Sequence, residues 1–524
     1  MEGRLACPSA ETSSHRSCEE FNARQRGDYF SRIRSNSNPS SNEFCDPACP
    51  EGHAGERSGA SRTQNGGGRM RQGRRNAAGR TTKIVICVAA MSFAGGAAEA
   101  TEGYFQYGYG ARQGALGGAG VADSRDAMSL SLNPAGLVDV GRQMQIGGAL
   151  FAPFRSYDAT GTALVAPGSF NSNSNYFVVP NIAYSSPLDL DSAWGFTLYG
   201  NGGMNTDWPN MANTTGACLA PPPFGFGGTP GVFCGGPARV DLMQAFLAVG
   251  YARRYGAFSF GISPVFAIQR FKADGLAAFA PFSSDSVHLT DNGYSYSYGG
   301  GLRGGVDWNV APSVRLGFSA QTPIWMTKFS RYSGLFSAGG EFDVPANLAA
   351  GVAWDLMRNL TLMVDYQHIF YGSIASIANS SAITGPGVLG LGNGPGFGWH
   401  DVDAIKFGAE WRASPVWTFR AGYVHNTNPV QSTDVTFNIL APGVVTDTFT
   451  GGFAYKATSN STIEFAAAYV PSHSVSGPER LGPPFPVPTP GSNIDISMHQ
   501  YQVTLGWTYQ SDTAPAPTPA LIHK

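Results

Sequence analysis

The sequence lacks a long apolar run, a surplus of charge and a catalytic signature, and each absence narrows the possible functions. No stretch of the 524 residues approaches the roughly eighteen apolar residues of a membrane-spanning helix. The formal net charge is only −2, so there is no basic surplus for a nucleic acid. No G-x-S-x-G nucleophile motif accompanies the scattered histidines, among them His288, His368, His400, His425, His473 and His499. We therefore expect no catalytic residue, no metal site and no cofactor.

An export signal precedes Thr101. Several basic residues lead into a short apolar run, and an A-x-A cleavage site ends at Ala100. We expect residues 70–100 to be a secretory signal peptide that starts at Met70. Residues 1–69 are polar and without periodicity, and we interpret them as an over-extended start or a disordered leader.

Cysteine is scarce in the expected mature chain. Only Cys218 and Cys234 follow residue 100, and thiols of an exported protein commonly pair. We expect a disulfide between them that contributes about 3 kcal/mol, with two free thiols as the alternative. Cys45 and Cys49 are closely spaced, but no matching second pair of metal ligands follows them.

From residue 142 to residue 510 the chain is a succession of short segments, most of them alternating in polarity. Around residue 465, for example, Ile463, Phe465 and Tyr469 fall on one face of a strand, and Thr462 and Glu464 fall on the other. Such strands suit a closed barrel with lipid outside and a wet lumen inside. Because Arg or Lys on the lipid face costs about 2–4 kcal/mol near the midplane, we expect the charged residues to face the lumen. Five examples are Arg315, Asp365, Lys406, Glu410 and Arg420.

The pattern predicts an all-β fold, a transmembrane antiparallel β-barrel of about fourteen strands over residues 142–510. The expected strands begin near Arg142, Asn175, Ala193, Arg239, Ala257, Tyr294, Ser313, Val344, Asn359, Val402, Pro415, Thr448, Ser461 and Ile496. Short connectors alternate with long ones rich in Gly, Pro and Ser, as in outer-membrane barrels with periplasmic turns. A soluble β-sandwich or β-helix is the alternative. Residues 511–524 are expected to form a disordered tail.

Residues 101–141 break the alternation. Aromatic residues lead into a Gly/Ala-rich stretch at residues 114–121, followed by an expected short helix around residues 124–132 and by Asn133-Pro134-Ala135. The segment is too long for a simple linker and too small for a separate domain. Irregular backbone is tolerated inside a barrel, where protein and water satisfy its polar groups. We therefore expect this segment, called the hatch below, to plug the lumen.

Several segments carry a family resemblance: GYGARQGALGGAGVADSRDAMSLSLNPAGL at residues 108–137, GNGGMNTDWP at residues 200–209, VPANLAAGVAW at residues 344–354, and WHDVDAIKFGAEWR with FRAGYVHNTNPV between residues 399 and 430. On these segments the chain resembles the FadL family (OMPP1/FadL/TodX) of outer-membrane transporters for long-chain fatty acids and hydrocarbons. The resemblance covers essentially the whole expected mature chain. It implies a fourteen-stranded barrel with an N-terminal hatch. It also implies ligand capture in an apolar groove among extracellular loops, a lumenal pocket, and sideways release through a gap at a kinked third strand.

The resemblance suggests where the gate and the lateral opening lie. The hatch gate is expected at Asn133, Pro134 and Ala135. The strand kink is expected at Gly200, Asn201, Gly202 and Gly203, because glycines and bulges weaken strand pairing. We expect the hatch gate to pack near this kink. An ordinary strand end that leads into a loop is the alternative.

Apolar and basic residues near two long loops are the candidates for ligand contact. The expected groove consists of Phe271, Leu276, Phe279, Phe282, Phe329, Tyr332, Leu335 and Phe336. Packing of these side chains against one another is the alternative. Candidate partners for a carboxylate headgroup are Arg270, Lys272, Lys328 and Arg331, with Arg303, Arg315, Lys406 and Arg420 deeper in the barrel. Ion pairing among the lumenal charges is the alternative role.

The expected function is passive, hatch-gated uptake of fatty acids or hydrocarbons with lateral exit into the membrane, without covalent chemistry. The alternatives are a general porin for polar solutes and a lipid-hydrolysing barrel enzyme. The expected partners are hydrophobic small molecules, outer-membrane lipid and lipopolysaccharide, with no nucleic acid. We expect a monomer in the outer membrane of a Gram-negative cell.

Overall fold

The computed structural model describes residues 101–223 and 225–511. The expected leader, the expected signal peptide and the tail from residue 512 lie outside the described residues.

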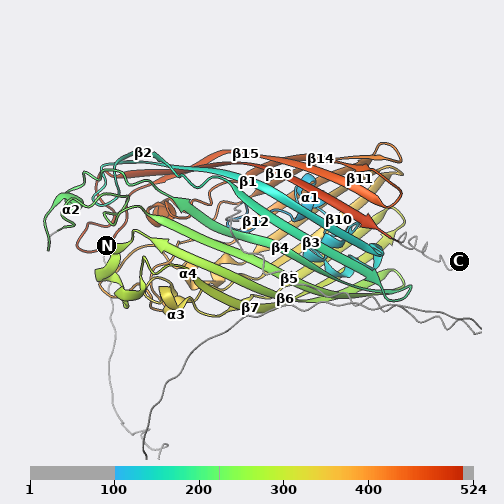
Figure 1. Cartoon of the computed structure of the whole chain (residues 1–524), viewed down its shortest axis with the longest axis horizontal. Helices are drawn as coiled ribbons and strands as arrows, with labels where there is room; N and C mark the ends of the chain where they lie inside the picture. The colour runs from blue at the N-terminus through green and yellow to red at the C-terminus, as the bar shows by residue number, and fades with distance from the viewer. Residues whose placement is uncertain (1–100, 224, 512–524) are drawn as a thin grey trace, which may run out of the picture. The chain divides into compact units, whose positions relative to one another are not determined.

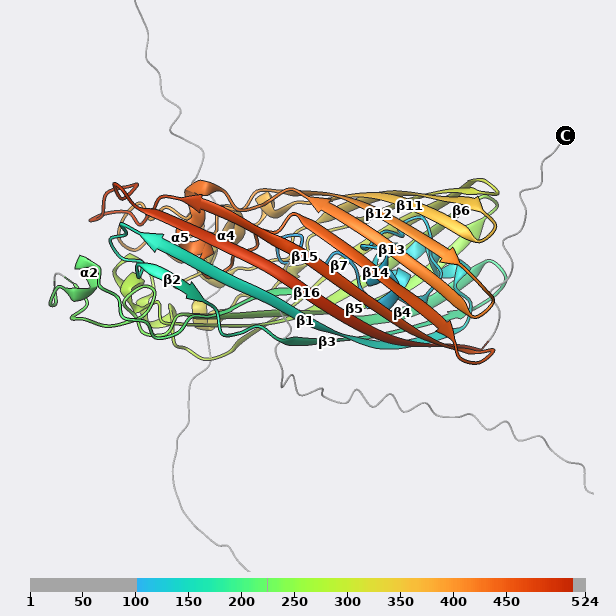
Figure 2. The same ribbon diagram turned by 90° about the horizontal axis from the view of Figure 1, so that it is seen from above.

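The strands form one antiparallel sheet that closes on itself (Figures 1 and 2). Each wall strand pairs with its neighbours in the sequence, and the last strand pairs with the first. Two short strands stand apart from this wall: β2 pairs with β1, and β9 pairs with β7. The sheet holds 16 strands, and without these two the closed wall has fourteen. Its strands are β1 (Gln143–Thr160), β3 (Phe177–Pro187), β4 (Ser192–Asp207), β5 (Arg239–Tyr255), β6 (Phe258–Asp274), β7 (Ser295–Ala311), β8 (Val314–Gln321), β10 (Asn347–Met357), β11 (Leu360–Ile369), β12 (Val402–Arg412), β13 (Trp417–Asn426), β14 (Asp447–Lys456), β15 (Ser461–Gly477) and β16 (Asn493–Gln510), while β2 is Gly168–Asn171 and β9 is Trp325–Met326.

The prediction of a fourteen-stranded barrel is confirmed, and the sandwich and β-helix alternatives are excluded. Every wall strand begins within three residues of its expected start. The short connectors gather at one end of the barrel and the long ones at the other (Figure 1). Side chains alternate as expected: Phe260 on the outside is 46% exposed, whereas its neighbour Ser259 is 1% exposed.

The described helices are short, and none of them is both long and apolar enough to cross a membrane. Three belong to the hatch: α1 (Gly110–Ala115), η1 (Ala127–Ser131) and η2 (Pro134–Asp139). The helix expected near residues 124–132 is thus a 3₁₀ turn, whose first amides are capped by Asp126 accepting from Ser129 N. The others lie in the long loops and are α2 (Gly216–Leu219), η3 (Ala277–Phe282), η4 (Ser286–His288), η5 (Ser330–Tyr332), α3 (Ser337–Gly340), η6 (Tyr371–Ser373), α4 (Ala375–Ala378), η7 (Ser432–Asp434) and α5 (Val435–Asn438).

The hatch lies within the ring of strands. In Figures 1 and 2 its blue ribbon is surrounded by the wall near the end with the short turns. Glycines in the wall allow its backbone to approach closely. At Gly422 an added Cβ would lie 2.2 Å from Leu116 C, and at Gly317 it would lie 2.4 Å from Val121 O. The backbone of residues 101–141 thus lies against the wall at these glycines, and its role as a plug of the lumen stays a prediction.

Candidate functional site

The barrel wall is incompletely paired beside β4. Pairing between β3 and β4 stops where Asn181 lies opposite Tyr199. Beyond this point β4 does not end: it continues to Asp207 on β5, with a register shift between Gly200 and Gly202. One residue is then left without a partner on β5, which is the geometry of a β-bulge. The expected kink is therefore at the expected place, and the alternative of an ordinary strand end does not apply.

The opposite side of this break is also unpaired. β1 pairs with β3 as far as Phe151 and with β2 only from Ser156 onward. The four β1 residues between them, like residues 200–207 of β4, have no ladder partner toward β3 among the described residues. We call this break in the ladder the wall gap.

The start of the hatch covers the wall gap from the inside. Phe105 forms an isolated antiparallel bridge with Gly202. Gln106 donates through its backbone N to Asn201 O at 3.2 Å and through Nε2 to Gly200 O at 3.0 Å. Tyr109 donates its hydroxyl to Asn201 Oδ1 at 2.8 Å. The hatch thus supplies hydrogen-bond partners to the β4 backbone that β3 does not provide.

Two side chains of the wall and loops fix this end of the hatch. Lys406 Nζ lies 2.8 Å from Glu102 Oε1, and both side chains are buried. The Tyr371 hydroxyl accepts from Tyr104 N at 3.0 Å and donates to Glu102 O at 2.6 Å. Gly103 has a positive φ of 69°, and a Cβ there would lie 2.6 Å from the same hydroxyl. The position therefore requires glycine.

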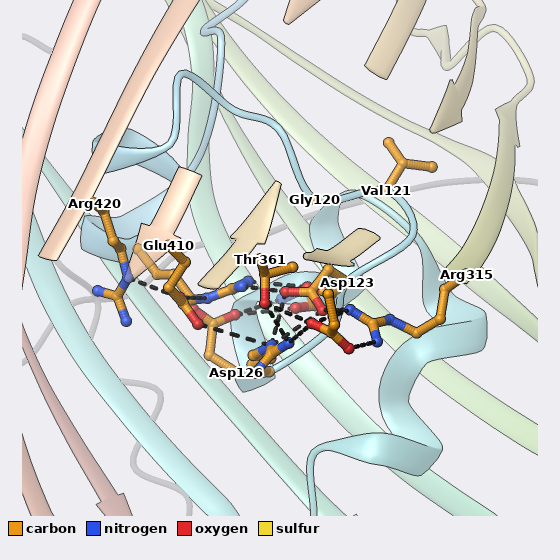
Figure 3. Close-up of polar contacts among 12 residues, drawn as sticks. Gly120, Val121, Asp123, Asp126, Arg315, Thr361, Glu410 and Arg420 are labelled. Atoms are coloured by element: carbon orange, nitrogen blue, oxygen red, sulfur yellow. Dashed lines mark hydrogen bonds and ion pairs between the residues drawn. The ribbon is translucent and has the colours of Figure 1, made fainter. Parts of the chain in front are cut away.

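Lumenal charges hold the rest of the hatch (Figure 3). Asp123 pairs with Arg112 at 2.6 Å and with Arg315 of β8 at 2.6 Å. Glu410 of β12 pairs with Arg112 at 3.0 Å and with Arg420 of β13 at 3.0 Å. These residues belong to the latch network, which consists of Arg112, Arg125, Arg315, Arg412 and Arg420 with Asp123, Asp355, Glu410 and Glu464.

The latch network keeps its central hatch carboxylate ionised. Burial alone would raise the pKa of Asp123, but Arg125, Arg112 and Arg315 outweigh burial and hold the pKa at about 2. A second anchor lies beside it, where Asp365 of β11 accepts from Gly120 N at 2.7 Å and Val121 N at 2.9 Å. All five charged residues expected to face the lumen therefore contact the hatch or its partners. Arg315, Lys406, Glu410 and Arg420 do so in ion pairs, whereas Asp365 accepts hydrogen bonds from backbone amides.

The hatch gate packs elsewhere than expected. Asn133 donates Nδ2 to Asp307 Oδ1 at 2.7 Å and to Val121 O at 2.9 Å. A Cβ on Gly305 would lie 1.9 Å from Asn133 Oδ1, and one on Gly261 would lie 2.3 Å from Ala135 N. The motif therefore seats against β6 and β7, whose glycines make room for it, and the expectation that it packs near the kink was wrong. Residues 105–109 contact the kink instead.

The expected groove residues meet, but as a buried cluster. Phe271 lies in β6 rather than in a loop. Its ring packs edge-to-face with Tyr332 at a centroid distance of 4.8 Å and at a tilt with Phe336 at 4.6 Å. Phe279 packs instead on Phe233 and Phe437, each at 5.2 Å. Leu276 and Phe329 are buried, whereas Phe282 and Leu335 are partly buried against the same cluster. Packing against one another is thus what these residues do in this structure, and their role as a ligand groove stays a prediction.

The four headgroup candidates near the loops already have partners. Arg270 pairs with Asp241 at 3.2 Å, and Lys272 pairs with Asp274 at 2.7 Å. Arg331 donates to Asn292 O at 2.8 Å, and Lys328 donates to Ala338 O. A ligand carboxylate would have to displace these contacts, so the structure does not favour any of the four.

Two cavities concern the lumen and the wall gap. The first lies in the lumen between residues 105–132 and wall residues that include Arg303, Asp365 and Lys406. The second lies at the wall gap, where Gly203, Met204 and Asn205 of β4 form one side. No local sequence pattern indicates the second cavity, because its walls come from five separate segments of the chain.

Two further expectations concern covalent and metal sites. Cys218 and Cys234 form a disulfide in the long loop after β4, with a Cα–Cα distance of 5.4 Å. Within residues 101–223 and 225–511, no cluster of His, Cys, Asp and Glu has the makings of a metal site.

Comparison with known proteins agrees with this architecture. The sequence model of the family described as outer membrane protein transport protein (OMPP1/FadL/TodX) matches residues 290–510. No curated protein matches the sequence.

Three solved structures show a similar fold. They are the Pseudomonas putida toluene transporter TodX (16% identity, TM-score 0.54, 77% of this chain and 99% of that one), a Pseudomonas aeruginosa FadL homologue (14% identity, TM-score 0.56, 78% and 100%) and the Ralstonia pickettii toluene transporter TbuX (18% identity, TM-score 0.51, 77% and 99%). At such identities the likeness concerns the fold.

The closed barrel, its apolar exterior and its internal hatch define the class of outer-membrane β-barrel proteins. The fold of the whole chain is that of the three solved barrels. Over residues 290–510 the sequence is similar to the OMPP1/FadL/TodX family of outer membrane transport proteins.

Proposed function

We propose that this protein lets hydrophobic small molecules, long-chain fatty acids or hydrocarbons, diffuse passively across the outer membrane. In this proposal the molecules enter among the long loops, pass the start of the hatch and leave sideways through the wall gap into the bilayer. The observation that carries the proposal is that residues 105–109 close the wall gap from inside by hydrogen bonds to the β4 bulge. The hatch segment and the opening it covers are therefore in direct contact.

A lateral route suits an apolar passenger. Each CH₂ group that leaves water gains about 0.8 kcal/mol, so a path that ends in the hydrocarbon of the membrane avoids returning the molecule to water. The seal at the wall gap rests on a few hydrogen bonds, each worth only about 0.5–1.5 kcal/mol net. By contrast, the latch network and Asp365 hold residues 112–125 by many charged contacts. In this proposal the first residues of the hatch move while residues 112–125 stay in place, a movement that also separates Glu102 from Lys406.

The names of similar proteins support both kinds of passenger. TodX and TbuX are toluene transporters, and a FadL homologue has the same fold. A porin for polar solutes is less well supported, because the hatch occupies the lumen. The porin would be favoured instead if proteoliposomes that contain the protein swelled in sugar solutions at a rate that depends on the size of the sugar.

The test is a reversible cross-link, called the lock below, between the start of the hatch and β4. Phe105→Cys and Gly202→Cys lie on a bridged antiparallel pair, whose Cβ atoms are typically about 4.5–5.5 Å apart, so a short bis-thiol linker can join them. The background is Cys218→Ser with Cys234→Ser, which leaves no other cysteine among residues 101–511. We expect the linked protein to lose uptake of palmitate and toluene into cells that lack other transporters for them.

A second linked pair controls for the linker itself. Tyr469→Cys and Tyr501→Cys face each other on β15 and β16 of the wall, far from the hatch along the chain. This cross-link should leave uptake at the level of the background. Uptake through the linked Phe105→Cys/Gly202→Cys protein at the background rate would contradict gating at the wall gap.

A further inference from the structure

Arg155 is a buried cation without an anionic partner. It points inward from β1, is 5% exposed, and its Nε and Nη2 atoms make no hydrogen bond among the described residues. The other buried basic side chains of the described ranges are all engaged: Arg112 with Asp123, Arg303 with Ser131 O and Gln321, and Lys406 with Glu102. The guanidinium carbon of Arg155 lies 5.8 Å from the ring centroid of Phe177.

Arg155 lines the cavity at the wall gap. The cavity is bounded by Arg155 and Phe151 of β1, by Gly203, Met204 and Asn205 of the unpaired part of β4, by Met498 of β16, and by Trp399 and residues 441–443 from the loops. Arg155 itself belongs to the four β1 residues that lack a ladder partner toward β3. The guanidinium of Arg155 therefore lies at the wall gap.

The surroundings favour an anion with an apolar tail. A buried charge is costly unless a partner and hydrogen bonds compensate it, and no carboxylate of the described residues does so. The cavity beside the guanidinium has room for a small polar group of about the size of a water molecule. The remaining walls are largely apolar, and Met204 and Met498 are adaptable side chains that can make room for an alkyl chain.

We propose that Arg155 binds the carboxylate of a single-chain hydrophobic acid at the wall gap. This inference rests on the proposed function and narrows it: the passengers of this chain include fatty acids, held by their headgroup at the exit, rather than neutral hydrocarbons alone. A guanidinium matches a carboxylate with two parallel hydrogen bonds. The tail then extends along Phe151, Met204 and Trp399 toward the unpaired edge of β4.

The test compares an acid with the matching alcohol. Purified wild-type protein in nanodiscs is titrated with decanoate and with decanol, and binding is followed by Trp399 fluorescence, corrected with Trp399→Phe. Arg155→Met removes the charge at similar length, and Arg155→Lys keeps the charge. Arg239→Met is the matched control, because Arg239 is half exposed and pairs with Asp207 at the rim of the same region.

We expect Arg155→Met to weaken decanoate binding about tenfold or more, as the loss of hydrogen bonds to a charged group predicts. Decanol binding should change by less than about twofold. Arg155→Lys should retain part of the affinity for decanoate, and Arg239→Met all of it. Native migration of unheated samples on gels establishes that each barrel is folded before it is titrated.

Three results would overturn the assignment. The first is that folded Arg155→Met binds decanoate as tightly as the wild type. The second is that the substitution weakens the binding of decanol as much as that of decanoate. The third is that it weakens the binding of decyl phosphate but not that of decanoate. Any of these leaves the proposed function standing if the lock at Phe105 and Gly202 still blocks toluene uptake. Loss of the gating effect in that lock, by contrast, overturns the proposed function itself.

Discussion

Glu410→Gln should release the hatch while the barrel stays closed. Glu410 lies within 3.0 Å of Arg112 and Arg420, at 3.4 Å from Arg412 and at 3.8 Å from Arg125. The latch network holds five arginines against four carboxylates. The substitution leaves five against three, and the guanidinium groups around position 410 then lack their shared partner.

The magnitude follows from burial. The side chain of Glu410 is 3% exposed, as is that of Arg112. Removing one partner of a buried ion pair costs about 3–5 kcal/mol. Since about 1.4 kcal/mol is tenfold in an equilibrium constant, the population of undocked hatch should rise about a hundredfold or more.

Hydrogen exchange at two hatch amides reports this population directly. Gly120 N and Val121 N donate to Asp365 only while the hatch is docked, so their exchange should accelerate by the same factor. Amides of the wall strands should exchange at unchanged rates. Asp207→Asn is the control: it removes an exposed ion pair with Arg239, worth at most about 1 kcal/mol. Equal exchange at Gly120 in the two variants would refute the latch.

Three further predictions concern the hatch. Gly305→Ala should displace Asn133 and increase proteolysis of the hatch. Gly304→Ala is the control, because its added Cβ meets nothing within 4 Å. Equal cleavage of the two variants would contradict the close packing of Asn133 on β7. Asn133→Ala with Pro134→Ala should reduce palmitate uptake in cells while heat-modifiable migration on gels shows an assembled barrel; unchanged uptake would remove the gate role of this motif. Because the pKa of Asp123 is lowered from 3.8 to about 2, its pairing adds about 2 kcal/mol of docking stability that is fully present above pH 4 and is lost as the pH falls toward 2. Pepsin should therefore begin to cleave residues 110–139 in that window, and at a higher pH in Asp123→Asn; cleavage that is independent of pH would contradict the linkage.

The barrel could be predicted from the sequence because lipid outside and water inside impose a period of two on every strand. The inward direction of the charged side chains was predictable from the same alternation. Pairing of neighbouring strands then places Asp365 opposite Lys406 and Glu410 opposite Arg420. The kink was predictable because Gly200, Gly202 and Gly203 pack no side chain into the ladder.

The remaining parts of the site depend on contacts between distant segments, which no local pattern reports. The bridge from Phe105 to Gly202 joins residues 97 positions apart, taking the difference of the two numbers, and involves a single pair. The aromatic residues near the loops were expected to form a ligand groove, because the sequence does not show that Phe336 and Tyr332 fold back on Phe271. Arg155 had one usable signal: it is an inward position whose partner on β16 is Met498 rather than an acid.

Photolabelling tests the lateral route most directly. A fatty acid with a diazirine in its alkyl chain is added to the protein in nanodiscs and irradiated, and the labelled residues are mapped by mass spectrometry. The account predicts labels at Met204 inside the wall gap and at Tyr176 and Val178, which are exposed on its outer side. Labels confined to the hatch and the short turns at the other end of the barrel would contradict lateral exit.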